Sequence, residues 1–238
     1  MKSFDKIFLL GIGITNAMEH EVLEYIITGL GQQTEKYFIV TPNPELLVIA
    51  DNNPKYKDIL NRAKLALADG IGVVWGAQLM GYPLKERIHG VDLLERLCSG
   101  IAKQPITVGF LGAGPNVAEK TSECLIKKYP GLKVSFASQE WNESLKSKKT
   151  DILFIAFGSP KQELWIAEHI SSIPAKVLIG VGGAFDFISG RVPRAPRFLR
   201  RLGLEWLFRL VIQPWRIKRQ LSLLKFIYLV LREKYRKA

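Results

Sequence analysis

Short apolar runs alternate along this sequence with longer segments whose apolar residues recur at helical spacing. Runs such as YFIVT (37–41) and DILFIAFG (151–158) are apolar on both faces, which is typical of strands buried in a parallel sheet. Neighbouring parallel strands are usually joined through a helix, so the alternation favours repeated βαβ units. We therefore predict an α/β fold, a three-layer Rossmann-like domain with a mainly parallel sheet, and a ligand site at the carboxyl ends of its strands.

The same patterns place the individual elements. We expect strands at residues 7–12, 37–41, 106–112, 133–137, 151–158 and 176–182. We expect helices at residues 19–30, 44–52, 55–68, 90–103, 115–129 and 160–170. No internal repeat interrupts this order, and the chain has enough apolar residues for one sizeable core.

The chain changes character after residue 193. Residues 194–238 contain 13 Lys and Arg against two acidic residues, so they carry +11 of the formal net charge of +12. Helical patterns at 202–213 and 214–238 predict a C-terminal helical appendage, with Pro214 where the second helix begins. We divide the sequence into a globular domain at 1–193 and a basic, amphipathic segment at 194–238.

The last predicted helix is apolar on two sides. One stripe consists of Ile217, Leu221, Leu224, Tyr228, Leu231 and Tyr235. The opposite side carries Leu223, Phe226, Ile227 and Val230. A helix with two apolar faces needs two partners, so we expect the protein body or a second subunit on one face and lipid on the other. Lys225 and Arg232 argue against a membrane-spanning helix.

The basic segment indicates an anionic partner. An anionic membrane surface fits the combination of charge with an apolar stripe. A nucleic acid is the alternative, because basic residues with interleaved aromatics also bind phosphodiesters. The membrane is favoured, since nucleic-acid binding leaves the polar residues at the strand ends of the body unexplained.

The composition argues against metal centres and secretion. Cys98 and Cys124 are the only cysteines, and three histidines form no spaced cluster, so we expect no structural zinc and no other cofactor. The apolar stretch near the N-terminus is too short for a signal peptide, and no later run is long enough to span a bilayer. We expect a cytosolic or peripheral protein.

Polar residues follow two of the expected elements. Thr41 and Asn43, after a strand, present a hydroxyl and an amide suited to sugar hydroxyls; alternatively, Asn43 caps a helix whose first residue is Pro44. Asp69 lies beside Gly70 between two helical patterns, where it serves either as a helix cap or as a general base.

Two further motifs could contact phosphate. Arg87 and Asp92 could bind phosphate and a sugar hydroxyl, or could pair with each other and cap a helix. Gly112 and Gly114 resemble a dinucleotide fingerprint, but Val117 stands where its third glycine belongs. This glycine turn could still offer backbone N–H groups to a diphosphate. A dinucleotide-dependent oxidoreductase is the enzymatic alternative.

The segments at 158–163 and 180–190 also follow expected strands. Ser159 and Gln162 have the spacing of a capping box, while Lys161 and Gln162 would project from a strand end toward diphosphate and sugar. Asp186 could bind a base or ribose.

None of the seven aspartates forms an Asp-x-Asp pair, the usual holder of a metal-bound diphosphate. Cations would have to replace the metal, and the candidates are Arg209, Arg216 and Arg219.

In this order, the motifs TPNPE, ADGIGVVW, RIHGVDL, GFLGAGP, GSPKQE, GVGGAFDFISG and RAPRFLRRLGLEWLFRL resemble the TagA/WecG/CpsF family of glycosyltransferases over nearly the whole chain. The resemblance implies inverting, metal-independent transfer of a sugar, typically N-acetylmannosamine or its uronic acid, from a UDP donor to an undecaprenyl-diphosphate-linked sugar. It implies a peripheral enzyme on the cytoplasmic face of the plasma membrane, in teichoic acid or other cell-surface polysaccharide synthesis.

The resemblance also implies roles for individual residues. Asp69 matches the general base, in a nucleotide-sugar-binding catalytic domain at 1–193. The residues that match the sugar, nucleotide or acceptor sites are Thr41, Asn43, Arg87, Gln162 and Asp186. Those that match cations reaching a diphosphate are Arg209, Arg216 and Arg219.

Overall fold

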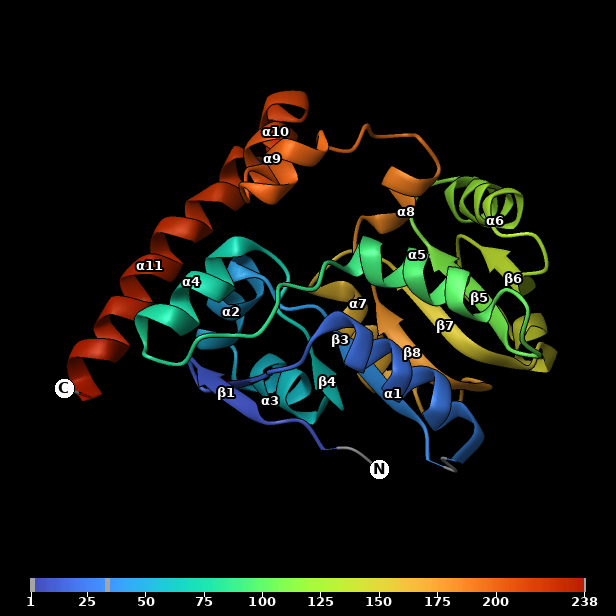
Figure 1. Ribbon diagram of the computed structural model, residues 1–238, viewed down its shortest axis with the longest axis horizontal. Coiled ribbons are helices and arrows are strands. Elements are labelled where there is room, and N and C mark those ends of the chain that lie inside the picture. The colour runs from blue at the N-terminus through green and yellow to red at the C-terminus, as the bar shows by residue number, and fades with distance from the viewer. Residues whose placement is uncertain (1–2, 33–34, 238) are drawn as a thin grey trace.

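A six-stranded parallel sheet forms the centre of the protein (Figure 1). The computed structural model describes residues 3–32 and 35–237, and for residues 32, 218–220 and 237 it describes the backbone alone. The strand order is β4 (Leu65–Ala66), β3 (Tyr37–Val40), β8 (Ala175–Gly180), β7 (Thr150–Ala156), β5 (Thr107–Gly112) and β6 (Lys133–Ser138). The predicted three-layer Rossmann-like α/β fold with a C-terminal helical appendage is confirmed.

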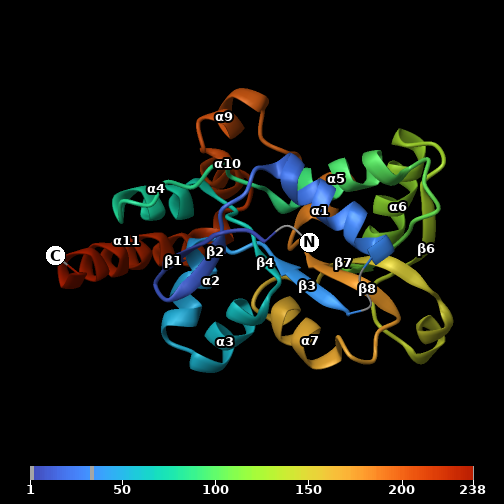
Figure 2. The same cartoon turned by 60° about the horizontal axis from the view of Figure 1, so that its bottom comes forward.

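Helices cover both faces of the sheet (Figure 2). On one face lie α1 (Glu19–Gln32), α5 (Gly90–Ile101) and α6 (Val117–Lys128). On the other lie α2 (Pro44–Asp51), α3 (Pro54–Arg62) and α7 (Lys161–His169). The inner strands β3, β7 and β8 therefore have apolar side chains on both faces, and this explains their apolar runs.

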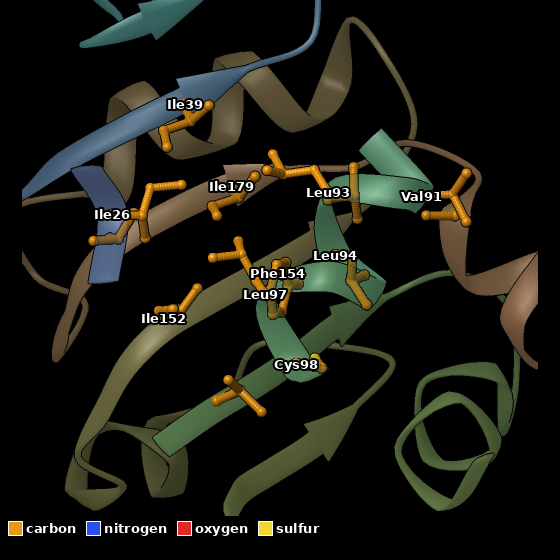
Figure 3. Packing of buried hydrophobic residues seen from close by; sticks show 14 of the residues in the cluster. Ile26, Ile39, Val91, Leu93, Leu94, Leu97, Cys98, Ile152, Phe154 and Ile179 are labelled. Atoms are coloured by element: carbon orange, nitrogen blue, oxygen red, sulfur yellow. The ribbon is translucent and has the colours of Figure 1, made fainter. Parts of the chain in front are cut away.

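Alternate strand residues divide the interior into two cores. Figure 3 shows one of them, in which Leu94 and Leu97 of α5 lie over Ile152 and Phe154 of β7. Leu153, between these two β7 residues in the sequence, belongs to the core on the opposite face. Side chains of successive strand residues point to opposite faces, so a single strand contributes to both cores.

The N-terminal segment differs from the prediction of one strand at 7–12. It forms an antiparallel hairpin of β1 (Lys6–Leu9) and β2 (Ile12–Thr15), outside the main sheet. Leu10 and Gly11, with φ of 53° and 74°, form the two-residue turn. Positive φ at both positions is the hairpin geometry that matches the twist of the flanking strands. The apolar run conceals this turn, because leucine is not a typical turn residue.

The predicted helix at 55–68 is also wrong in its second half. Helix α3 ends at Arg62, and Ala63 has an extended ψ of 136°. Leu65 and Ala66 then form β4, which pairs in parallel with Ile39 and Val40. Sheet hydrogen bonds at the edge of β3 outweigh the helical spacing of the apolar residues in this segment.

The remaining elements lie mainly in the C-terminal part of the chain. They are α4 (Ile71–Leu79), a 3₁₀ turn at Glu143–Ser147, α8 (Ala184–Ile188), α9 (Arg197–Arg201), α10 (Glu205–Ile212), a 3₁₀ turn at Pro214–Arg216 and α11 (Ile217–Lys237). Helix α11 runs diagonally beside α2 and α4 (Figures 1 and 2). The predicted appendage thus lies against the body.

One apolar side of α11 packs into the protein. Phe226, Leu229 and Val230 are buried within the same core as α2 and α4. A Cβ on Gly76 of α4 would lie only 2.9 Å from the ring of Phe226, so the glycine is what permits this close approach. The backbone N–H of Leu10 donates to Oε2 of Glu233 at 2.9 Å, which ties the end of α11 to the hairpin.

The other stripe of α11 is exposed. Leu221, Leu224 and Tyr228 are 59%, 66% and 61% exposed, on the stripe that the sequence separates from the Phe226 side. No helix within residues 3–32 and 35–237 is both long and apolar enough to cross a bilayer.

Replacing Phe226 with Ala should undock α11 while leaving the sheet domain folded. Truncating a buried phenylalanine costs about 3 kcal/mol, which raises the undocked fraction about 100-fold. Limited trypsin digestion should then cut α11 faster. The matched control is Leu224→Ala on the exposed side, and equal cleavage rates in the two variants would contradict this packing role.

Candidate active site

Two adjoining cavities lie where the strand ends of the body meet the appendage. The first, of about 310 Å³, is polar and lies at the carboxyl ends of β3, β7 and β8. Its lining includes Thr41, Asn43, Asp69, Gln162, Asp186, Arg209 and Arg216. The expected position of the site, at the carboxyl ends of parallel strands, agrees with this cavity.

The second cavity, of about 540 Å³, is mainly apolar and lies between the body and the appendage. It is lined by parts of α4, α10 and α11, including Trp75, Trp206 and Phe226. Asn43, Asp69, Arg209 and Arg216 line both cavities. These four side chains therefore mark the junction between a polar and an apolar compartment.

Thr41 and Asn43 shape the loop after β3. The Thr41 hydroxyl donates to the carbonyl of Gly180 at 3.1 Å, which joins the ends of β3 and β8. Oδ1 of Asn43 accepts the N–H of Leu46 at 3.1 Å, and Pro44 is the first residue of α2. Asn43 is thus the helix cap that the sequence offered as one alternative, and it lines both cavities as well.

Asp69 pairs with a histidine that the sequence analysis did not single out. Nδ1 of His89 and Oδ1 of Asp69 are 2.7 Å apart. Asp69 does not cap α4, because Gly70 occupies the cap position and α4 has no side-chain cap. His89 stands in the RIHGVDL motif, but a separation of 20 residues gives no local signal that the two side chains meet.

The Asp69–His89 contact changes the ionisation of the histidine. Burial by itself would lower the pKa of His89, but the hydrogen bond and the negative charge of Asp69 outweigh burial and raise this pKa above 6.5. His89 therefore stays protonated in the folded protein to a higher pH than an ordinary histidine does.

Gln162 and Glu163 form a buried network in place of the predicted capping box. Pro160, without a side-chain cap, precedes α7. Nε2 of Gln162 donates to Oε1 of Glu163 at 2.7 Å and to the Ser159 hydroxyl at 3.2 Å. Oε1 of Gln162 accepts the N–H of Gly182 at 3.1 Å. Gln162 thus connects the loop after β7 with the loop after β8.

Glu163 was missed by the sequence analysis, since a glutamate in a first helical turn is usually solvated. It is fully buried and accepts a 3.0 Å hydrogen bond from the Tyr56 hydroxyl. Burial raises its pKa, in opposition to the hydrogen bonds from Gln162, Ser159 and Tyr56. Lys161, in contrast, is exposed and lines neither cavity.

Arg87 and Asp92 both hold the appendage, and they are not paired with each other. Nη2 of Arg87 donates to the carbonyl of Arg200 at 2.6 Å, and Arg87 lines the apolar cavity. Both oxygens of Asp92 accept from Arg194 at 2.7 Å, and Arg194 also reaches Glu205 at 3.5 Å. Asp92 lines neither cavity. Bidentate pairing of this kind fixes geometry more strongly than a single ion pair does.

The glycine turn after β5 lines neither cavity, although it packs against Ala156, which lines the polar one. Gly112 has a φ of 110°, and a Cβ on it would lie 2.8 Å from the carbonyl carbon of Ala156. A Cβ on Gly114 would collide with the guanidinium of Arg191. Arg191 also pairs with Asp186 at 3.8 Å, and Asp186 lines the polar cavity.

The appendage contributes two guanidinium groups to the junction. Arg209 lies over the loop after β8, so that a Cβ on Gly183 would be 2.6 Å from its Nη2. Its guanidinium carbon is 4.8 Å from the centre of the Phe187 ring. Oε1 of Gln213 accepts from both Arg209 and Arg216, at 3.3 and 3.4 Å. The predicted side chain of Arg219 lies outside the described residues.

Within the described part of the chain, no group of three or more His, Cys, Asp or Glu is placed to hold a metal ion.

Residues 7–238 match the glycosyl transferase WecG/TagA/CpsF family. The N-acetylglucosaminyldiphosphoundecaprenol N-acetyl-beta-D-mannosaminyltransferase of Bacillus spizizenii is 36% identical over 226 residues, or 92% of this chain and 86% of the relative. A relative of the same name from Staphylococcus aureus is 33% identical over 239 residues, or 96% of this chain and 93% of the relative. The similarity therefore extends over both the body and the appendage.

The raised pKa of His89 predicts a pH-dependent contribution to stability. This contribution is complete below about pH 6.5 and is lost as the pH rises through the higher pKa of the folded state. Asp69→Asn should lower the pKa of His89, because burial then dominates. NMR titration of the imidazole signals and melting temperatures between pH 6 and 9 test this expectation. An unchanged His89 titration in Asp69→Asn would contradict it, and the signals of His169 on α7, whose Nδ1 lies 2.9 Å from the Trp165 carbonyl, provide the control.

Proposed function

The chain belongs to the WecG/TagA/CpsF family of glycosyl transferases, and we propose that it moves a sugar from a UDP donor to a sugar linked to undecaprenyl diphosphate. N-acetylmannosamine, or a related hexose or uronic acid, is the proposed donor sugar. The names of the two relatives, N-acetylglucosaminyldiphosphoundecaprenol N-acetyl-beta-D-mannosaminyltransferases, support both the sugar and the lipid-linked acceptor.

The position of Asp69 at the junction of the two cavities carries this proposal. The polar cavity, with the loops after β3, β7 and β8, suits the sugar and the diphosphate of the donor. The apolar cavity, which opens between α4, α10 and α11, suits the lipid-linked acceptor. A base between these compartments would meet the acceptor hydroxyl where it approaches the donor sugar.

The proposed reaction is a single displacement with inversion. Asp69 takes the proton of the acceptor hydroxyl, and the acceptor oxygen forms a bond to the anomeric carbon of the donor. The bond from this carbon to the diphosphate breaks, and UDP leaves with the electron pair. Arg209 and Arg216 line the polar cavity and would stabilise the developing charge, and Arg219 is proposed as a third cation. The proposed use of cations makes a bound metal unnecessary.

The remaining side chains of the cavities are proposed as binding residues. Thr41, Asn43 and Gln162 would hold the sugar, Asp186 the nucleotide, and Arg87 the acceptor side. Thr41 and Gln162 also form hydrogen bonds with the backbone of Gly180 and Gly182, so they would hold the loop after β8 in place as well. The proposal does not need the other expected contacts, which line neither cavity: Asp92, Gly112, Gly114 and Lys161.

The exposed stripe of α11 supports docking on an anionic membrane, on the cytoplasmic face where the donor is available. Leu224 and Tyr228 of α11 are 66% and 61% exposed, and Trp215 in the turn before this helix is 71% exposed. Lys225, Arg232 and Lys234 are exposed on α11 as well. Basic residues close to an anionic bilayer contribute about 1 kcal/mol each. Several such residues with apolar side chains suffice for reversible attachment.

Asp69→Ala should reduce transfer at least about 100-fold, because the acceptor loses its base, while UDP binding stays intact. The assay combines a panel of UDP-sugars with an undecaprenyl-diphosphate-GlcNAc analogue, and UDP release and product mass are measured. The control is Asp58→Ala, an exposed aspartate of α3 that pairs with Arg62 and lines neither cavity. If the Asp69→Ala variant keeps most of the turnover, Asp69 is not the base. If the unmodified protein transfers no sugar from any donor, the proposed function is wrong.

Introducing aspartate at Leu221 and Leu224 together should lower binding to phosphatidylglycerol vesicles about tenfold or more, because charge enters the docking stripe. Both residues are exposed, so folding should be unaffected. Leu164→Asp on α7, which is 36% exposed, is the matched control. Vesicle flotation that does not differ between these variants would exclude this stripe as the docking surface.

A further inference from the structure

The Asp69 carboxylate is held at only one of its two oxygens. Oδ1 is 2.7 Å from Nδ1 of His89, whereas Oδ2 has no hydrogen-bond partner among the described residues. The Asp69 side chain is 31% exposed, so Oδ2 can meet a molecule in the cavities that Asp69 lines. The two oxygens of this carboxylate therefore have different surroundings.

The backbone around both residues is already fixed. The N–H of Asp69 donates to the carbonyl of Pro42 at 2.9 Å, and the N–H of Ile88 donates to the carbonyl of Ala68 at 3.0 Å. The carbonyl of His89 accepts the N–H of Leu93 at 2.9 Å, in the first turn of α5. Rotation of the Asp69 side chain is the main freedom that these bonds leave, and the final torsion of an aspartate is broad.

The ring of His89 lines the apolar cavity, and among the described residues its one hydrogen bond is the contact with Asp69. His89 precedes α5, but its side chain makes no cap hydrogen bond. Nε2 is buried and has no partner among the described residues, which costs about 1–3 kcal/mol. An apolar side chain would avoid this cost. The contact with Asp69 is the feature that accounts for an imidazole at this position.

We propose that His89 is a positioning residue, whose Nδ1–H donates to Oδ1 of Asp69 and so orients Oδ2 as the oxygen that accepts the proton of the incoming hydroxyl. This inference rests on the proposed function, in which Asp69 is the general base. His89 is not itself proposed as the base: its ring lines the apolar cavity, but Nε2 is buried and Nδ1 is engaged with Asp69. A base must lie within hydrogen-bond reach of the proton, and a displacement of about 1 Å can cost 100-fold in rate.

The chain allows a matched pair of substitutions. His89→Leu removes the donor to Asp69, together with the buried Nε2. His89→Asn retains a donor, because the Asn Nδ2 occupies nearly the same position relative to the backbone as the histidine Nδ1. The two variants thus separate the hydrogen bond to Asp69 from the bulk and aromaticity of the ring.

The experiment measures kcat, both KM values and UDP affinity for these variants in the full-length protein. His89→Leu should lower kcat about 10- to 100-fold, with KM and UDP affinity within about twofold of the parent. Its melting temperature should stay within a few degrees, since the unpaired buried nitrogen is lost with the hydrogen bond. His89→Asn should recover kcat to within about threefold. A purely structural role would instead lower stability and change KM together with kcat.

Two outcomes would overturn the inference. One is a kcat of His89→Leu equal to that of the parent, and the other is a loss in His89→Asn as large as in His89→Leu, in folded protein. Asp69→Ala, measured in parallel, separates the proposed base role of Asp69 from the proposed positioning role of His89. If Asp69→Ala stays active, the base assignment itself fails. If Asp69→Ala is inactive while His89→Leu keeps full kcat, only the role of His89 fails.

Discussion

Parallel pairing of β3, β8 and β7 is the constraint on which the candidate site depends. In a parallel sheet every strand ends at the same edge, so the loops after residues 40, 156 and 180 emerge side by side. Hydrogen bonds then join these loops directly. Thr41 binds the Gly180 carbonyl, and Gln162 binds the N–H of Gly182. The order of the strands therefore brings together the loops that line the polar cavity. The buried Glu163 accepts a hydrogen bond from Gln162 and so helps to hold Gln162 between two of these loops.

The appendage completes the site through contacts of three kinds. Apolar packing of Phe226 against Gly76 holds α11 on the body, and the paired side chains of Asp92 and Arg194 hold the segment before α10. Arg209 then lies over Gly183 and stacks on Phe187. Undocking of α11 would remove one wall of the apolar cavity, to which α11 contributes Leu223, Phe226 and Val230. Arg209 of α10 and Arg216 of the 3₁₀ turn, which line the polar cavity, both donate to Gln213.

Local patterns predicted much of the fold. Strands apolar on both faces and the Asn43–Pro44 helix start appear as expected. Helix α11 has a buried and an exposed apolar side as predicted, but Leu229 is buried and Ile227, expected on the side of Phe226, is 46% exposed. The errors arose where tertiary contacts outweighed a local pattern. Leu10 turns with positive φ, Leu65 joins the edge of β3, and Ser159 binds Glu163 in place of capping α7. The strand partner of Leu65 is remote in sequence, leucine at position 10 carries no turn signal, and Glu163, four residues after Ser159, lies outside the spacing of a capping box.

The sequence by itself determined the fold class, the basic and two-sided last helix, and the family, because periodicity, charge and motif order are properties of neighbouring residues. Only the tertiary structure decided which side chains meet. Asp69 and His89 are 20 residues apart in the chain, and Asp92 and Arg194 are 102 apart. Such pairs depend on the order of strands in the sheet and on how the appendage docks. Neither is encoded in local spacing, so the partner of the candidate base could be found only in the folded chain.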